Sequence, residues 1–231
     1  MKKKSVLIVD DELSIIKFLR ATLEARGYKV SAAMDGADAI HIFEMEQPDI
    51  LLLDIMMPRI DGFEVCRRLR EWSQTPIIML SAKGDEGDKV KALDLGADDY
   101  ITKPFGTEEL FARLGAVFRR TAGSATIPTQ SSFSSGDLNI NFAQRQVTVA
   151  GNEVKLTPTE YCLLQELVLN AGKVLTHIQL LNNVWGPEYR EERDYVHVFI
   201  GRLRAKLETD PTNPNRIVNV SGVGYQFKNA A

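Results

Sequence analysis

Residues 50–58, Ile50-Leu-Leu-Leu-Asp54-Ile-Met-Met-Pro58, place four large apolar side chains directly before a carboxylate. A short apolar run between polar neighbours is typical of a strand that is buried on both faces of a parallel sheet. Residues 6–9 and 77–80 form two similar runs, and residues 29–33 and 100–102 are weaker candidates for two more strands. Helical patterns near residues 13–26, 36–46, 63–71, 86–95 and 107–119 separate these runs. Residues 1–120 are therefore predicted to form a doubly wound α/β domain with a five-stranded parallel sheet.

The second half of the chain has a different pattern. Residues 121–132 are small, polar and mostly uncharged, which indicates a flexible linker. Residues 138–141 and 146–149 alternate as strands do, and a turn signal follows at 150–153. Thr157, Pro158 and Glu160 are typical of a helix start, and two more helices are expected near 176–185 and 192–208. With a terminal hairpin over 217–227, residues 133–231 are predicted to form an α+β winged helix-turn-helix domain.

Composition excludes several classes of protein. Of the 231 residues, 44% are hydrophobic and 26% are charged, as in ordinary globular proteins. No apolar run approaches the ~20 residues of a membrane span, and Asp10 interrupts the signal-like start, so we expect a cytoplasmic protein. Cys66 and Cys162 are too isolated for a zinc site. Residues 1–120 hold 18 basic and 21 acidic side chains, and the remainder holds ten of each. DNA contact must therefore depend on a local patch.

Reactive side chains follow the predicted strands of the first domain. Because the carboxyl ends of parallel strands meet at one edge, these residues should converge; they are Asp10, Asp11, Asp54, Ser81 and Lys103. Clustered carboxylates suit Mg²⁺. A carboxylate can also attack phosphorus to form an aspartyl-phosphate, whose charge a cation and a hydroxyl would neutralise. Asp54 is central in this array and is the predicted nucleophile.

Four motifs carry a specific resemblance over residues 5–120. Val6-Leu-Ile-Val-Asp10-Asp11-Glu12, Leu52-Leu-Asp54-Ile-Met-Met-Pro58, Leu80-Ser81-Ala82 and Gly96-Ala-Asp-Asp-Tyr100-Ile-Thr-Lys103-Pro104 resemble the flavodoxin-like receiver domain of bacterial two-component response regulators. The resemblance implies that Asp54 accepts phosphate from a histidine kinase and that Lys103, before a cis bond to Pro104, contacts the phosphate. It implies Mg²⁺ ligands at Asp10, Asp11, Asp54 and the Met56 carbonyl. It further implies that Ser81 and Tyr100 are the switch pair.

Phosphatases of the haloacid-dehalogenase type also use an aspartate nucleophile with Mg²⁺ and lysine. They need a second aspartate two positions later as acid and base, and Met56 stands there. Rapid turnover is therefore not expected. Slow self-catalysed phosphotransfer and dephosphorylation are the most enzymatic behaviour that we predict.

Charged residues at helical spacing between positions 85 and 120 have two interpretations. They are either solvated surface pairs or a contact between two copies of the chain. The chain resembles the OmpR/PhoB subfamily, whose active receivers pair symmetrically. That resemblance implies intermolecular ion pairs of Lys89 with Glu109, Asp98 with Arg113 and Asp99 with Arg120. It implies an apolar centre of Val90, Leu93 and Phe111.

The third helix of the second domain is the predicted DNA-contacting element. Its core stripe is expected at Val196, Ile200, Leu203 and Leu207, and an amphipathic helix with a basic outer face is the alternative. Motifs at residues 156–164, 180–186, 198–207 and 222–227 resemble the OmpR/PhoB winged-helix effector domain, over roughly residues 135–228. The residues expected at DNA are Arg193, Tyr195, His197, Val198, Phe199, Arg202, Arg204, Lys206, Ser221 and Tyr225. Ser221 and Gly201 stand where basic residues are common, which predicts weak binding by a monomer.

These patterns together predict a phosphorylation-dependent transcription regulator that dimerises on tandem promoter half-sites and contacts RNA polymerase. A regulator that needs no phosphate is the alternative, and the complete set of receiver residues argues against it. Residues 67–73 and 184–189 are similar to potassium-transport regulators of the KdpE type.

Overall fold

The structure is a computed structural model that describes residues 3–82, 84–122 and 130–229. The chain divides into two compact units, Met1–Leu114 and Gly115–Ala231. The linker predicted at residues 121–132 falls mainly on residues 123–129, which lie outside the described residues. Its first two residues belong to a helix and its last residue begins a strand.

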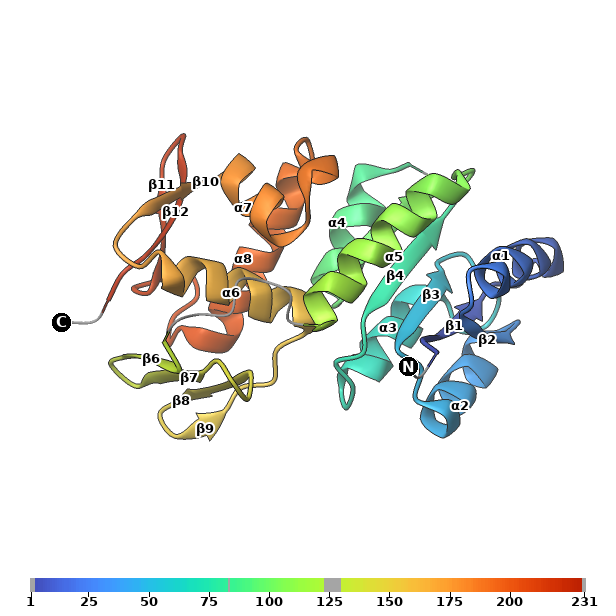
Figure 1. The fold of residues 1–231 in the computed structure, drawn as a ribbon, viewed down its shortest axis with the longest axis horizontal. Coiled ribbons are helices and arrows are strands. Elements are labelled where there is room, and N and C mark those ends of the chain that lie inside the picture. Colours follow the sequence, from blue (N-terminus) through green and yellow to red (C-terminus); the bar gives the residue numbers. More distant parts are fainter. Residues whose placement is uncertain (1–2, 83, 123–129, 230–231) are drawn as a thin grey trace. The chain divides into compact units, whose positions relative to one another are not determined.

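The first unit contains a five-stranded parallel sheet with the strand order β2-β1-β3-β4-β5 (Figure 1). Its strands are β1 (Ser5–Val9), β2 (Lys29–Ala33), β3 (Ile50–Asp54), β4 (Ile77–Ser81) and β5 (Asp99–Thr102). Its helices are α1 (Leu13–Ala25), α2 (Gly36–Glu46), α3 (Gly62–Arg70), α4 (Glu86–Asp94) and α5 (Thr107–Ala122), of which α5 continues into the second unit. The prediction of a doubly wound domain is confirmed.

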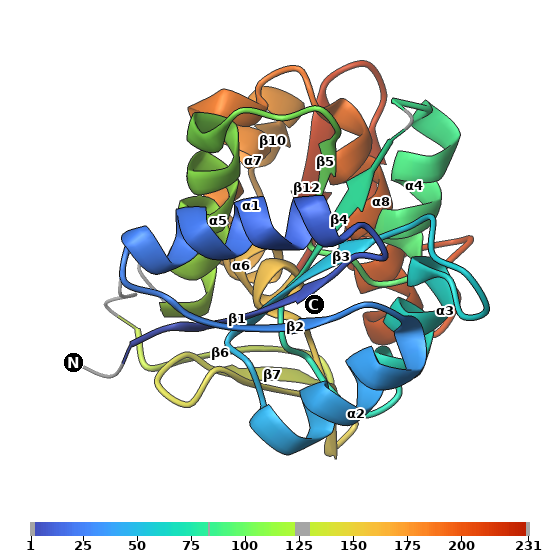
Figure 2. The same cartoon turned by 90° about the vertical axis from the view of Figure 1, so that its right-hand side faces the viewer.

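Helices cover both faces of this sheet, with α1 on one face and α2 on the other (Figure 2). Every residue of β3 and β4 is buried, so these strands have no polar alternation. Their uninterrupted apolar runs reflect this double burial. The polar exceptions are Asp54 and Ser81, each of which is the last residue of its strand.

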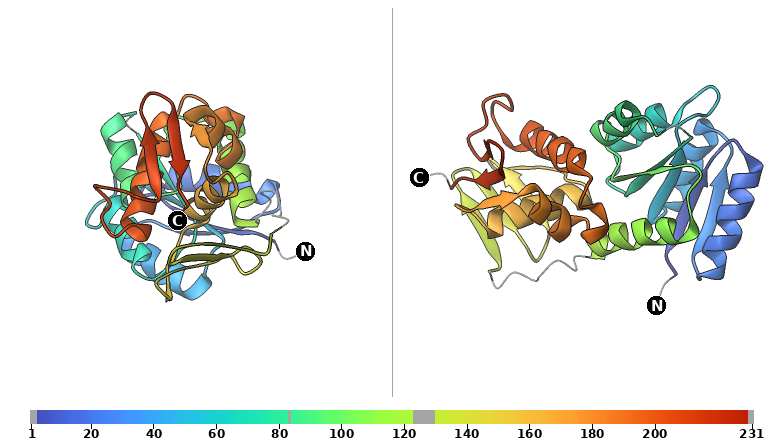
Figure 3. Two further views of the ribbon diagram at one scale, coloured as in Figure 1. Left: turned by 90° about the vertical axis from the view of Figure 1, so that its left-hand side faces the viewer. Right: turned by 90° about the horizontal axis from the view of Figure 1, so that it is seen from above.

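The second unit contains two antiparallel sheets and three main helices. The first sheet is β6 (Ser132–Ser135), β7 (Leu138–Asn141), β8 (Gln146–Val149) and β9 (Asn152–Glu153), in that order. Then come α6 (Pro158–Leu169), α7 (His177–Val184) and α8 (Arg193–Leu207). The second sheet has the order β10-β12-β11 and consists of β10 (Val174–Thr176), β11 (Ile217–Val220) and β12 (Gly224–Phe227). The left panel of Figure 3 shows the β11–β12 hairpin, the wing, in red.

Helix α6 begins as the sequence predicts. The Thr157 hydroxyl accepts a hydrogen bond from the Glu160 amide, and the Glu160 carboxylate accepts one from the Thr157 amide. Strands β6, β9 and β10 were not predicted. Strand β6 is mostly serine and lies beside the predicted linker, while β9 and β10 are too short to show alternation. The winged-helix prediction is otherwise confirmed.

Candidate functional site

The strand ends bring three of the predicted site residues together. Asp10 directly follows β1, Asp54 ends β3, and Lys103 directly follows β5. The Lys103 Nζ lies 2.6 Å from Asp10 Oδ2 and 2.5 Å from Asp54 Oδ1. Both carboxylates are buried, and the Lys103 side chain is only 12% exposed. One ammonium group therefore bridges two carboxylates at the carboxyl edge of the sheet.

Backbone amides hold the other carboxylate oxygens. The Glu12 amide donates to Asp10 Oδ1 at 2.9 Å, and the Met56 amide donates to Asp54 Oδ2 at 2.7 Å. The Lys103 amide donates to the Ser81 carbonyl at 2.6 Å, which positions the turn after β5. The peptide bond between Lys103 and Pro104 is cis, as predicted.

Burial and charge act in opposite directions on this cluster. Burial raises the pKa of Asp54, Lys103 lowers that pKa and Asp10 raises it further, so the pKa lies above its usual value. For Lys103, burial lowers the pKa, but the hydrogen bonds to Asp10 and Asp54 raise it more. Lys103 therefore stays protonated. The charged pair offers a carboxylate oxygen beside a fixed cation, which suits attack on a phosphoryl group.

The loop after β3 packs closely against the site. A Cβ on Gly62 would stand 2.2 Å from the Asp54 carbonyl oxygen, so only glycine fits this position. The Gly62 amide donates to the Ile55 carbonyl. These contacts fix the backbone of Asp54 and Ile55, directly before Met56.

The predicted metal ligands are only partly assembled. Asp10 and Asp54 converge, whereas Asp11 is exposed. Among the residues that the structure describes, no group of three or more His, Cys, Asp or Glu side chains could hold a metal ion. The nearby donors are nevertheless oxygen atoms, the class that Mg²⁺ prefers.

Ser81 and Tyr100, the predicted switch pair, are in contact. Burial raises the pKa of the Tyr100 hydroxyl, and a hydrogen bond with the Ser81 side chain lowers it, with a net upward shift. Ser81 is 1% exposed and Tyr100 is 5% exposed. Their hydroxyls connect β4 and β5 at the edge of the sheet that carries Asp54.

The charges predicted to join two receivers have partners within the chain. Arg70 Nη2 lies 2.9 Å from Asp98 Oδ2, and Arg113 Nη1 lies 3.1 Å from Asp99 Oδ1. The structure thus places Arg113 beside Asp99, where the resemblance implied Asp98. The sequence offered no signal for Arg70, which also donates to the carbonyls of Gly96 and Thr75.

The predicted apolar centre is also divided. The Phe111 ring lies 6.5 Å from the Tyr28 ring, and the Arg26 guanidinium stacks on it at 4.2 Å. Phe111 therefore packs against the end of α1 in its own unit. On α4, Leu93 is buried and Val90 is half-buried. Arg113 also lies 3.5 Å from Glu109 on the same helix.

The orientation predicted for α8 is wrong for its aromatic residues. Tyr195 and Phe199 are fully buried, and both rings pack against Trp185. Val198 is also buried. The helix buries seven residues, a stripe wide enough to include the face that was expected to contact DNA.

Two basic residues of α8 form ion pairs with the same buried carboxylate. Arg202 and Lys206 lie 2.8 Å and 2.6 Å from the oxygens of Glu160, which is 0% exposed. Burial raises the pKa of Glu160, but the attraction of both cations outweighs it and leaves the pKa below its usual value. This cluster joins α8 to α6. Arg202 therefore has a structural partner where the sequence predicted a guanine contact.

The remaining predicted DNA contacts lie in the first two turns of α8, in its last turn and on the wing. Arg193, His197 and Ser221 are exposed. Arg204 donates twice to the Ile217 carbonyl, at 2.9 and 2.7 Å, and thereby connects α8 to β11. Tyr225 on β12 is buried, with its hydroxyl 2.7 Å from His197 Nδ1.

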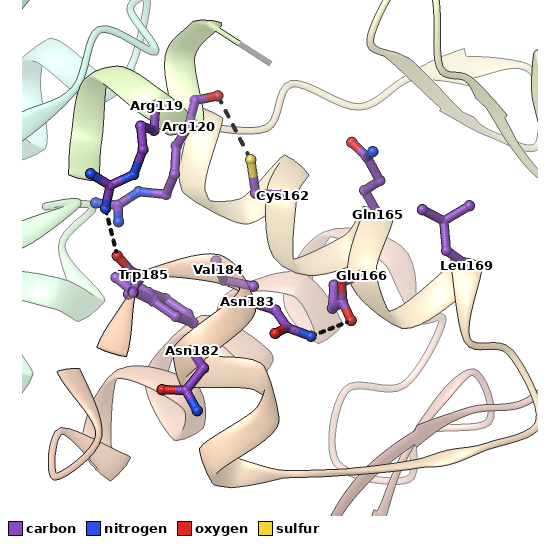
Figure 4. A pocket seen from close by; sticks show the side chains of 11 residues that line it. Arg119, Arg120, Cys162, Gln165, Glu166, Leu169, Asn182, Asn183, Val184 and Trp185 are labelled. Atoms are coloured by element: carbon purple, nitrogen blue, oxygen red, sulfur yellow. Dashed lines mark hydrogen bonds between the residues drawn. The ribbon is translucent and has the colours of Figure 1, made fainter. Parts of the chain in front are cut away.

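A small pocket of about 120 Å³ lies in the second unit, between α6, α7 and the last turn of α5 (Figure 4). The Cys162 thiol donates to the Arg120 carbonyl at 3.7 Å, and Asn183 donates to Glu166 at 2.9 Å. Arg120, which the resemblance placed in a dimer contact, is buried here.

Family models match both halves of the chain. Residues 6–115 match the response regulator receiver domain, and residues 151–227 match the C-terminal domain of transcriptional regulatory proteins. Within the described residues, no helix has the length and hydropathy needed to cross a membrane.

Several known proteins are similar to this chain over nearly its whole length. A probable transcriptional regulator, ycf27 of Cyanophora paradoxa, is 43% identical over 100% of this chain and 99% of its own length. The KDP operon regulatory protein KdpE of Escherichia coli is 45% identical over 96% and 98%. The crystal structure of the response regulator DrrB, an OmpR/PhoB homologue of Thermotoga maritima, has a TM-score of 0.52 and 31% identity over 98% of this chain and all of its own.

Proposed function

Because this chain belongs to the OmpR/PhoB family of DNA-binding response regulators, we propose that phosphorylation of Asp54 controls its binding to promoter DNA. The observation that supports this most directly is the contact of Lys103 with both Asp10 and Asp54. In the proposed reaction, an Asp54 oxygen bonds to phosphorus as the bond to a histidine nitrogen of the kinase breaks. The electron pair of that bond leaves with the imidazole. Lys103 neutralises the phosphoryl oxygens.

Mg²⁺ is the proposed cofactor. Asp10, Asp11, Asp54 and the Met56 carbonyl would hold it, and it would neutralise charge on the phosphoryl group. The oxygen donors and the burial of Asp10 and Asp54 support this assignment. Lys103 already balances part of the carboxylate charge, so we propose that Asp11 completes the set only when the ion is bound.

Phosphorylation is proposed to act through Ser81 and Tyr100. A phosphoryl group on Asp54 would draw the Ser81 hydroxyl toward it and so change its hydrogen bond with Tyr100. That change would alter the surface of α4, β5 and α5 in favour of a symmetric dimer. The proposed interface uses Lys89, Val90, Leu93, Asp98, Asp99, Glu109, Phe111, Arg113 and Arg120. Asp99 and Arg113 would have to exchange their present partners.

A dimer would place two effector domains on tandem half-sites and so compensate for weak binding by one domain. A histidine kinase, promoter DNA and RNA polymerase are the proposed partners, and the cytoplasm is the proposed location of this chain. The two other candidate functions are a regulator that needs no phosphate and a Mg²⁺-dependent phosphatase with an aspartate nucleophile. Met56 stands against the phosphatase, because it cannot transfer a proton to a leaving group.

The test measures the mass of the full chain by light scattering, with and without beryllofluoride and Mg²⁺. We expect doubling of the mass and tighter promoter binding for the parent protein. Asp54→Ala should abolish both responses, whereas Asp38→Ala, on the exposed start of α2, should retain them. An Asp54→Ala protein that still dimerises with an active phosphodonor would refute the proposal. Rapid phosphate release from a small ester would favour the phosphatase.

A further inference from the structure

The outer face of α8 carries little chemistry for contacting bases. Its exposed residues are Lys206, which pairs with Glu160, and four residues that recur at intervals of four, namely Arg193, His197, Gly201 and Ala205. A Cβ on Gly201 would have nothing within 4 Å, so the middle of this face is open. Arg193 lies at the first turn of the helix. The side chains of Gly201 and Ala205 have no group that can hydrogen-bond. Of these four residues, His197 is therefore the one beyond the first turn that can hydrogen-bond to a base.

The wing orients the His197 ring. The Tyr225 hydroxyl lies 2.7 Å from His197 Nδ1, so the other ring nitrogen, Nε2, is left free of this contact. Burial raises the pKa of the Tyr225 hydroxyl more than Arg204 lowers it, so the phenol keeps its proton. A phenol is a good donor, and an imidazole nitrogen is a good acceptor. A phenol that keeps its proton can donate to Nδ1, and in that arrangement the ring carries its proton on Nε2.

A second histidine packs against this pair. The His177 ring on α7 lies 5.0 Å from the His197 ring and 5.5 Å from the Tyr225 ring, with its edge toward Tyr225. Burial lowers the pKa of His177, the electrostatic interactions with His197 and Arg193 lower it further, and a hydrogen bond with the Val223 backbone raises it. His177 is therefore neutral at pH 7, and it packs beside the hydrogen bond between Tyr225 and His197.

The geometry points to His197 as a specificity-determining residue that donates a hydrogen bond from Nε2 to a guanine, with Tyr225 as the positioning residue that fixes the donor. In the major groove, guanine presents two acceptors, N7 and O6, side by side. A ring with a single fixed donor matches that edge. The edge of adenine presents N7 beside an amino group, which is a donor, so it matches the His197 ring less well than the edge of guanine does.

The inference requires DNA binding by α8, and it does not require phosphorylation. Every variant is therefore compared with the parent full-length chain in the same state, with beryllofluoride and again without it. A failure of the proposed phosphate switch would change the parent and the variants alike. If the inference about His197 is wrong, the His197 variants will show the same base preference as the parent chain.

The experiment selects bound DNA from a random pool and then measures affinity for the best site with each base substituted in turn. His197→Ala should weaken binding about tenfold and remove the guanine preference at one position of each half-site. His197→Gln should shift that position toward adenine, because an amide both donates and accepts. His41→Ala, an exposed histidine on α2, is the matched control and should change nothing.

Tyr225→Phe removes the hydroxyl and keeps the ring that packs against His177. We expect a smaller loss of guanine preference at the same position and an unchanged dependence of affinity on salt, because no phosphate contact is lost. Thermal unfolding of each variant checks that the domain remains folded. The inference is overturned if His197→Ala keeps the preferences of the parent, if the preference changes at all positions equally, or if the parent selects no DNA sequence.

Discussion

Replacing Glu160 with glutamine tests whether Arg202 and Lys206 have a structural role. The substitution keeps the size of the side chain and an oxygen that can accept from the Thr157 amide. It removes the charge that both cations face in a site that is 0% exposed. Breaking a buried ion pair typically costs about 3–5 kcal/mol. Because the Lys206 side chain is 33% exposed and can turn toward solvent, we expect the lower end, about 3 kcal/mol.

The assay is urea unfolding of the full chain in a Trp72→Phe background. Trp185 then reports on the second unit, since it is 1% exposed and packs against Phe199. With a slope of about 1.5 kcal/mol per molar urea, the midpoint should fall by about 2 M. Glu188→Gln is the matched control, because its pair with Arg119 is exposed, and it should change stability by less than about 0.5 kcal/mol.

The effect should depend on pH in a defined direction. Burial raises the pKa of Glu160, but Arg202 and Lys206 lower it more, so the folded pKa lies below the unfolded value. The carboxylate therefore stabilises the domain above the unfolded pKa, and this stabilisation disappears as the pH falls through the folded pKa. The parent and the Glu160→Gln protein should converge in acid. An unchanged midpoint at pH 7, or a difference that persists in strong acid, would refute the reasoning.

Four further predictions concern other contacts. Arg70→Ala removes the ion pair of Arg70 with the buried Asp98 and should cost about 3 kcal/mol in urea unfolding followed by circular dichroism, whereas the exposed Arg68→Ala should cost much less; equal losses would contradict this. Gly62→Ala should destabilise the protein by about 1–3 kcal/mol and slow its phosphorylation by acetyl phosphate, because the added Cβ would collide with the Asp54 carbonyl oxygen. Gly115→Ala is the control, since its Cβ would meet no backbone atom, and it should have neither effect. Normal phosphorylation of the Gly62 variant would contradict this reasoning. Lys103→Met should abolish beryllofluoride binding measured by fluorine NMR, and a bound signal would exclude the role of its ammonium. Because burial and nearby charges lower the pKa of His177, the second unit should lose stability in urea as the pH falls below 6.5, and His177→Gln should reduce this loss.

The receiver site was predictable because its residues directly follow the apolar runs. Once β1, β3 and β5 are recognised, parallel strands bring Asp10, Asp54 and Lys103 to one edge. The partner of Asp98 was not predictable, because Arg70 lies 28 positions away and belongs to a run of three arginines on one helix. The sequence pattern contains nothing that selects one of them.

The orientation of α8 failed for a different reason. A helical period identifies the middle of a buried stripe but not its width. Tyr195 and Phe199 lie beside that stripe. Trp185, directly after α7, covers both rings, and Tyr189 also packs against Tyr195. The role of Arg202 likewise depends on Glu160, which lies 42 positions earlier. The sequence pattern around Glu160 is that of a helix start, and it contains no sign of a second role for the carboxylate.

The strand order of the first unit has a mechanical consequence. Strands β1 and β3, which carry Asp10 and Asp54, have a hydrogen-bonded strand on each side, whereas β5 borders β4 alone. Displacing β5 disturbs one ladder, while displacing β1 or β3 disturbs two. The two carboxylates therefore lie at the ends of interior strands, whereas Tyr100 and Lys103 belong to an edge strand and the turn after it, which can move more easily. A movement that begins when Asp54 is phosphorylated can therefore displace β5 while β1 and β3 keep their hydrogen bonds to each other.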